Sequence, residues 1–114
     1  MHYGSKKHLK GLAAHNRQRK ENMSKKRQLI EIFADAMAAN NDYIAVAVET
    51  EGNEENEVII NPSCNFENKL DYYRNAYDEN LVLKKFNGIR IVGACSFDED
   101  CEWNIILEML NETM

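Results

Sequence analysis

The feature that most constrains the fold is a short strand with two apolar faces. Residues Tyr43–Thr50 alternate with the two-residue period of a β-strand and are rich in β-branched side chains. One face carries Ile44, Val46 and Val48, and the other carries Tyr43, Ala45 and Ala47. A strand with one solvated face alternates apolar and polar residues instead. We therefore expect residues 43–50 to form the central strand of a sheet.

Two further strands are predicted downstream. The polar run 51–56 is a turn, and Glu57–Asn61 returns after it as a second strand. The short connection predicts an antiparallel hairpin with the first strand. Pro62, the only proline, ends the second strand because it has no N–H to donate to a ladder. Ile89–Cys95 is the third strand.

Apolar residues with helical spacing predict two helices before the third strand. The first is expected near Arg17–Ala39, and Asn40-Asn41-Asp42 supplies its stop. The second is expected near Phe66–Asp78, with Asn65 as its N-cap and Tyr72 pointing to a rim or to solvent. The apolar stripes are Leu29, Ile32, Phe33, Ala36 and Met37 in the first helix, and Phe66, Leu70, Tyr73 and Tyr77 in the second.

A third helix is expected after the last strand. Ser96 and Glu99 have the spacing of a capping box, and the acids at 98–100 suit the positive end of a helix. This assignment runs the helix to about Asn111. Its expected buried face consists of Trp103, Ile106, Leu107 and Leu110.

The order α-β-β-α-β-α predicts an α+β fold with one small domain around a three-stranded sheet. The second helix is a crossover, so the second and third strands run in the same direction. The sheet is mixed if those strands are neighbours, and antiparallel in the order 2-1-3 if the first strand separates them. The two apolar faces of the first strand favour the second arrangement. Residues 81–86 fit either a linker or a short fourth strand, because Asn87-Gly88 is a good hairpin turn.

Charge is distributed unevenly along the chain. Residues 1–27 carry nine of the fourteen Lys and Arg residues against the single acid Glu21, a net charge of +8. Residues 28–114 carry the other five against eighteen acids, a net charge of −13. We therefore expect a basic N-terminal arm at 1–23 and an acidic domain at 24–114. The candidate contacts with nucleic acid or an acidic partner are Lys6, Lys7, Lys10, Arg17, Arg19, Lys20, Lys25, Lys26 and Arg27.

The sequence predicts no catalytic site, cofactor site or metal site. It lacks the Gly-rich phosphate loop, the Gly-x-Ser-x-Gly elbow and the His-Glu-x-x-His zinc motif. His2, His8 and His15 form at most a loose group, of a kind more typical of solvent-exposed or phosphate-facing histidines. No histidine follows His15 to complete a zinc set with Cys95 and Cys101. The odd number of cysteines predicts three free thiols, at least one of them buried.

Two segments resemble known families. One is Leu9-Lys10-Gly11-Leu12 followed by His15-Asn16-Arg17-Gln18-Arg19, which resembles the His-Asn-x-Arg segment of plasmid mobilisation relaxases of the MobV type. The preceding strand and later metal-binding histidines of that family are absent, so the likeness implies mobile-element ancestry and no relaxase activity. Residues 43–95 resemble small uncharacterised proteins of phages and prophages of Gram-positive bacteria. The positions that carry this second resemblance are Glu57-Val58-Ile59-Ile60-Asn61-Pro62, Asn65, Lys69-Leu70, Tyr72-Tyr73, Ala76-Tyr77 and Leu81.

These features together predict a non-enzymatic accessory protein of a phage or other mobile element that acts by macromolecular binding. No apolar run approaches the roughly 20 residues that span a bilayer, and the basic start lacks the apolar core of a secretory signal. We expect a cytoplasmic protein whose acidic domain binds a host or phage protein. One alternative is a phage inhibitor of a host defence or nucleic-acid enzyme that resembles anti-CRISPR proteins, with the acidic domain as a mimic of nucleic acid. Another is a small structural or assembly component.

Overall fold

The sheet has β1 at its centre, as the two apolar faces of this strand predict. The computed structural model describes residues 23–114, so the predicted helix start near Arg17 lies outside the described residues. β1 (Tyr43–Thr50) lies between β2 (Glu57–Pro62) and β3 (Ile89–Phe97), and it pairs antiparallel with both. The antiparallel order β2-β1-β3 is therefore confirmed, and the mixed sheet is excluded.

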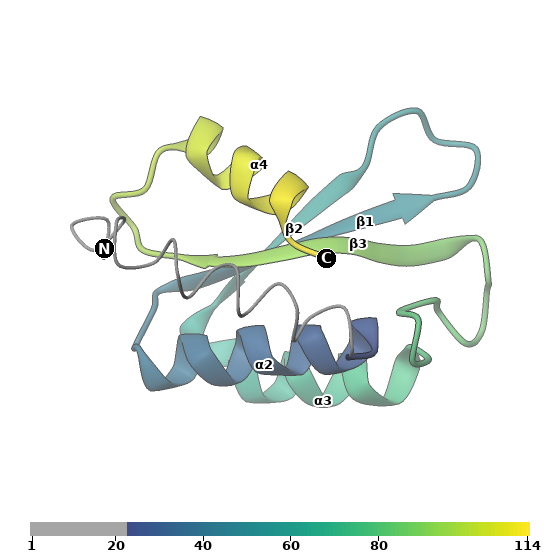
Figure 1. The fold of residues 1–114 in the computed structure, drawn as a ribbon, viewed down its shortest axis with the longest axis horizontal. Helices are drawn as coiled ribbons and strands as arrows, with labels where there is room; N and C mark the ends of the chain where they lie inside the picture. The colour runs from purple at the N-terminus through teal and green to yellow at the C-terminus, as the bar shows by residue number, and fades with distance from the viewer. Residues whose placement is uncertain (1–22) are drawn as a thin grey trace.

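Helices cover both faces of this sheet (Figure 1). α2 (Lys25–Ala38) and α3 (Phe66–Ala76) lie side by side on one face, and a short 3-10 turn, η2 (Ser63–Asn65), leads into α3. α4 (Trp103–Glu112) lies on the other face, against β3 and β1. The described residues thus form one α+β unit with the predicted element order.

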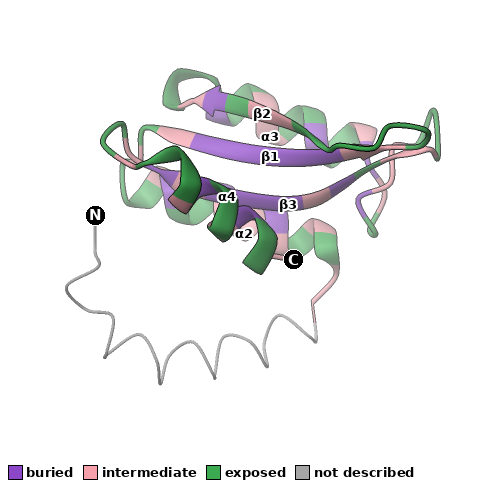
Figure 2. Cartoon of the chain, turned by 90° about the horizontal axis from the view of Figure 1, so that it is seen from above, coloured by how far each residue is buried: buried purple, intermediate pink, exposed green. Residues whose placement is uncertain are grey.

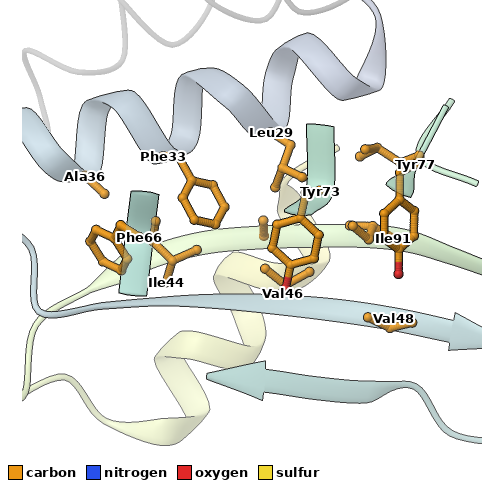
Figure 3. Packing of buried hydrophobic residues seen from close by; sticks show 12 residues of the cluster. Leu29, Phe33, Ala36, Ile44, Val46, Val48, Phe66, Tyr73, Tyr77 and Ile91 are labelled. Atoms are coloured by element: carbon orange, nitrogen blue, oxygen red, sulfur yellow. The ribbon is translucent and has the colours of Figure 1, made fainter. Parts of the chain in front are cut away.

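The larger apolar cluster lies between the sheet and the helices α2 and α3 (Figure 3). Phe33 is fully buried at its centre, with ring centroids 5.9 Å from Phe66 and 5.8 Å from Tyr73. Ile44 and Val46 supply the floor from β1. The predicted stripes of both helices therefore form the core, while Tyr72 is about half exposed, as predicted.

The boundaries of the first two helices follow their local chemistry. α2 begins at Lys25 because the Ser24 hydroxyl accepts a hydrogen bond of 3.1 Å from the Arg27 N–H, which is an N-cap contact. It stops before Asn40, whose φ of 55° is left-handed. Asn65 occupies the N-cap position of α3, as predicted, but its side chain makes no capping bond.

The predicted capping box at Ser96 and Glu99 is wrong. Ser96 belongs to β3, opposite Ile44 of β1, and α4 begins only at Trp103 with Glu102 at the N-cap position. Sheet pairing continues as far as Phe97, whose ring stacks on Tyr43 at 5.3 Å. This long-range pairing outweighs the local capping preference, because a helix start at Ser96 would remove the end of the β1–β3 ladder.

Residues 81–86 take part in two isolated β-bridges and do not form a continuous strand. Tyr77 pairs with Leu83, and Val82 pairs with Arg90 of β3. The Ile89 N–H donates to the Phe86 carbonyl at 3.2 Å, which closes the predicted turn at 87–88. The segment thus lies along the start of β3, intermediate between the linker and the fourth strand that the sequence allowed.

Candidate binding surfaces

The helix α4 buries only part of its apolar surface. Ile106 and Leu110 pack against small and aromatic side chains of the sheet, in a second cluster that includes Ala45, Cys95 and Phe97. Gly93 has no side chain to keep the helix away from the sheet. A Cβ added at this position would lie 2.5 Å from the Leu110 carbonyl oxygen. The backbone of α4 therefore approaches β3 closely near its C-terminal end.

Trp103 and Leu107 lie on the outside of this helix, which corrects the prediction that both are core residues. Trp103 is 52% exposed and Leu107 is 38% exposed. The two residues are one turn apart on the same side of α4. The facing positions of the sheet are filled by Ala45, Ala47 and Gly93, and close contact with these small residues leaves the wider apolar stripe of α4 partly in solvent.

We call the pair Trp103 and Leu107 the α4 surface. Figure 2 shows α4 coloured mostly as exposed and lying over β3, with β2 at the far edge of the sheet. Residues 98–112 contain six acids and no Lys or Arg: Asp98, Glu99, Asp100, Glu102, Glu108 and Glu112. All of these except the half-buried Asp98 are exposed, so the α4 surface has an acidic border.

Five other acids form a second group at the other end of the sheet. Glu49, Glu51, Glu54, Glu55 and Glu57 lie on the β1–β2 hairpin. Arg90 neutralises one of them, since its Nε donates to Glu49 Oε1 at 2.8 Å, and this contact raises the pKa of Arg90. These two groups lie at opposite ends of the sheet, and seven further acids lie elsewhere, so the acids do not gather on a single face: Glu31, Asp35, Asp42, Glu67, Asp71, Asp78 and Glu79.

Three of the nine predicted contact residues lie in the described part of the chain. Lys25, Lys26 and Arg27 form the first turn of α2, whereas Lys6, Lys7, Lys10, Arg17, Arg19 and Lys20 lie outside the described residues. Lys25 and Arg27 are exposed. Lys26 is held within the protein: its Nζ donates to the Tyr77 carbonyl at 2.8 Å and lies 3.9 Å from Glu79.

The structure adds Arg74 to this basic group. Arg27 and Arg74 come from α2 and α3, and they line an open groove of about 350 Å³ together with Lys26, Ile30, Asn75 and the acid Glu79. Arg74 lies in the last turn of α3, where a cation is favoured by the helix dipole. Sequence patterns do not indicate this shared groove, because it depends on the antiparallel packing of two helices that are about 40 residues apart.

The three cysteines are free thiols in residues 23–114, as predicted, and Cys95 is buried. Burial raises the pKa of Cys95 to about 12, with a smaller contribution from Cys101. Such a thiol is protonated at neutral pH and is a poor nucleophile. Cys64 is exposed beside an open, mostly polar groove of about 400 Å³ between the end of α2 and the start of α3.

Other functional chemistry is sparse in the described residues. Between residues 23 and 114, no three His, Cys, Asp or Glu side chains are arranged to hold a metal ion. None of the helices in that range is long and apolar enough to cross a membrane. The distinctive features of residues 23–114 are consequently two exposed surfaces: the α4 surface and the basic groove. No protein-family model, curated protein or solved structure matches this chain.

Proposed function

We propose that this protein acts by binding, without catalysis, and that the α4 surface takes a partner protein. The observation that carries the proposal is the exposure of Trp103, the only tryptophan in the chain, beside the exposed Leu107. Exposed tryptophans next to aliphatic residues are typical of the few side chains that dominate binding energy at protein interfaces. The acidic border favours a partner with a basic surface, because attraction between unlike charges speeds association and repulsion between like charges excludes acidic competitors.

The proposed setting is a phage or other mobile element, on the strength of the resemblance of residues 43–95. Within that setting, an inhibitor of a host enzyme and an assembly component both require a partner-binding surface. The spread of the acids over both ends of the sheet and over α2 and α3 favours contact with a protein over imitation of a nucleic-acid strand.

The sole tryptophan gives a direct test. A partner that covers Trp103 should shift its fluorescence emission to shorter wavelength and protect it from a soluble quencher. Affinity capture from bacterial lysate should compare the wild-type chain with the double variant Trp103→Ala, Leu107→Ala. A matched control is Asn104→Ala, Asn111→Ala, which alters two exposed polar residues of the same helix. Partners lost only with the first variant support the proposal, and identical capture by all three baits contradicts it.

A second candidate function is binding of phosphate groups in nucleic acid by the basic residues. The observation that favours it is that Arg27 and Arg74 line one groove from two different helices. Guanidinium groups bind phosphates without reading sequence. The acidic remainder of the domain opposes such binding within about 8–10 Å, the Debye length at moderate salt.

Titration of labelled duplex and single-stranded DNA at low and moderate salt tests this candidate. If about five phosphates are neutralised, the slope of log affinity against log salt should be near −4.5 on duplex DNA. Arg27→Ala with Arg74→Ala should weaken binding, whereas Lys84→Ala with Lys85→Ala, two exposed cations outside the groove, should not. No binding by the intact chain at low salt removes this function.

A further inference from the structure

The two edges of the sheet differ in how many backbone groups they leave open. The outer edge of β3 is occupied by other parts of the chain. The Ile91 N–H donates to the Leu81 carbonyl at 2.9 Å, and the Ala94 N–H donates to the Thr113 hydroxyl at 3.2 Å. The Ile89 carbonyl accepts from the Leu83 N–H at 2.9 Å. This edge is thus largely closed.

The outer edge of β2 is open in the described structure, and its free groups follow from the ladder. The Ser63 N–H donates to the Asp42 carbonyl at 2.9 Å, and residues 42 and 63 continue the β1–β2 register. Bonded and non-bonded pairs alternate along an antiparallel ladder. Asn61, Ile59 and Glu57 therefore bond to β1, whereas the backbone groups of Val58 and Ile60 face outward. The backbone of Pro62 also faces outward, so its missing N–H removes no hydrogen bond between β2 and β1.

The side chains at this edge are suited to another strand. Val58 and Ile60 are opposite Ala47 and Ala45, so their side chains lie on the α4 side of the sheet. Ile60 is 40% exposed, and α4 lies toward the opposite edge, over β3 (Figure 2). The outward groups are flanked by apolar side chains, and the only charge within β2 is Glu57 at its first position. Lysine, a common protection against edge pairing, is absent from β2.

We propose that β2 pairs with β2 of a second copy of this chain, antiparallel, about a two-fold axis through Ile59. In this register Val58 of each copy lies opposite Ile60 of the other, and each of these two pairs exchanges two backbone hydrogen bonds. Pro62 selects this register over the next one along the strand. That alternative would pair Val58 with Pro62, which has no N–H to donate.

The charges of the two copies are compatible with this pairing. Glu57 of one copy lies opposite the uncharged Asn61 of the other, so no like charges face each other across the strands. The hairpin acids Glu54 and Glu55 then extend toward the start of α3 in the second copy. The dipole of that helix attracts an acid at this end, whereas Glu67 in its first turn repels one, so the two effects oppose each other there.

The symmetry has a consequence for binding. A two-fold axis perpendicular to the sheet keeps each face on its own side, so α4 of both copies lies on the same side of a continuous six-stranded sheet. Two copies of the α4 surface would then be presented together. The pairing itself does not rest on the function proposed for that surface.

Disulfide trapping tests the register in the full-length chain. Ile59→Cys, with Cys64→Ser and Cys101→Ser to remove the more accessible native thiols, should give a covalent dimer under mild oxidation. Residues opposite each other in a non-bonded antiparallel pair are about 4.5 Å apart at Cα, within reach of a disulfide. Ile60→Cys in the same background should cross-link poorly. Preferential cross-linking of Ile60→Cys would overturn the proposed register.

Sedimentation equilibrium over a range of concentrations tests the interface itself. Ile60→Pro removes one outward N–H from each copy and leaves the β1–β2 bonds intact, so the dimer dissociation constant should rise about tenfold or more. Circular dichroism and melting establish that the variant is folded. Phe86→Ser, which removes an exposed apolar residue outside the sheet edges, is the matched control and should dimerise normally.

Three outcomes overturn the proposal. One is a wild-type chain that is monomeric throughout the concentration range. Another is a dimer that survives Ile60→Pro but is lost with Trp103→Ala, which would move the interface to the α4 surface. The third is a monomeric chain whose capture of a cellular protein is lost with Ile60→Pro, which would assign the edge to a strand of that protein.

Discussion

The Leu110 carbonyl oxygen lies directly over Gly93, 2.5 Å from where a Cβ on that glycine would be. Gly93→Ala should therefore force α4 away from the sheet, because the obstructing atom belongs to the backbone and has no rotamer to change. We expect a loss of about 1–3 kcal/mol of unfolding free energy, measured by denaturant titration. Asn111→Ala, on the exposed side of the same helix, should change little. Equal stability of Gly93→Ala and wild type would mean that α4 is not held this close.

Trp103 should behave as a surface residue. The native protein should emit near the wavelength of a solvated indole, and Trp103→Ala should lower stability by less than about 1 kcal/mol. Phe33→Ala, which empties the centre of the larger cluster, should cost about 3–5 kcal/mol. An emission maximum typical of a buried indole in the dilute protein would contradict the exposed position.

The start of α2 depends on Ser24. Its hydroxyl accepts from the Arg27 N–H, so Ser24→Ala should lower stability by about 1 kcal/mol in thermal or denaturant unfolding. Ser96→Ala serves as a comparison, since Ser96 lies within β3 and caps no helix. A larger effect at Ser96 than at Ser24 would favour the capping box that the structure rejects.

Tyr73 has a buried hydroxyl group, and burying a hydroxyl without a hydrogen bond lowers stability. Its hydroxyl is buried without a hydrogen-bond partner in the described structure and points toward the sheet (Figure 3). Asn61 is nearby, but its amide donates to the Ile44 carbonyl at 3.3 Å. Tyr73→Phe keeps the ring and removes the hydroxyl, so unfolding free energy should stay the same or increase. A clear loss of stability would show that the hydroxyl has a partner.

Stability should decline at alkaline pH. Burial raises the pKa of Cys95 from 9.0 to about 12 and that of Tyr77 from 10.0 to about 12. The unfolded chain therefore loses these protons first, so the contribution of these two groups to the unfolding free energy should be steady below pH 9 and fall as pH rises toward 12. Cys95→Ala should reduce the slope between pH 9 and 12 in denaturant titrations. An unchanged slope would mean that Cys95 ionises as readily in the folded protein.

The sequence by itself determined most of the local structure of residues 23–114. Apolar residues repeat every two positions in β1, β2 and β3 and about every 3.6 positions in α2 and α3. These spacings identified the five elements, because they show which face of each element meets the core. The two apolar faces of β1 also predicted its central place, because helices cover both faces at the centre of the sheet. The antiparallel order followed from that place together with the crossover between β2 and β3.

Only the tertiary structure decided where α4 begins and which of its residues remain exposed. Ser96 has the local chemistry of a helix cap, but its backbone is committed to the β1–β3 ladder, and that competition is invisible in a short window of sequence. Trp103 has helical spacing with Ile106 and Leu110, and periodicity alone assigns it to the core. Its exposure depends on how much of the helix the small residues Ala45 and Gly93 can cover. The position of Arg27 and Arg74 along one groove likewise depends on packing, because sequence patterns record spacing within an element and not the distance between two helices.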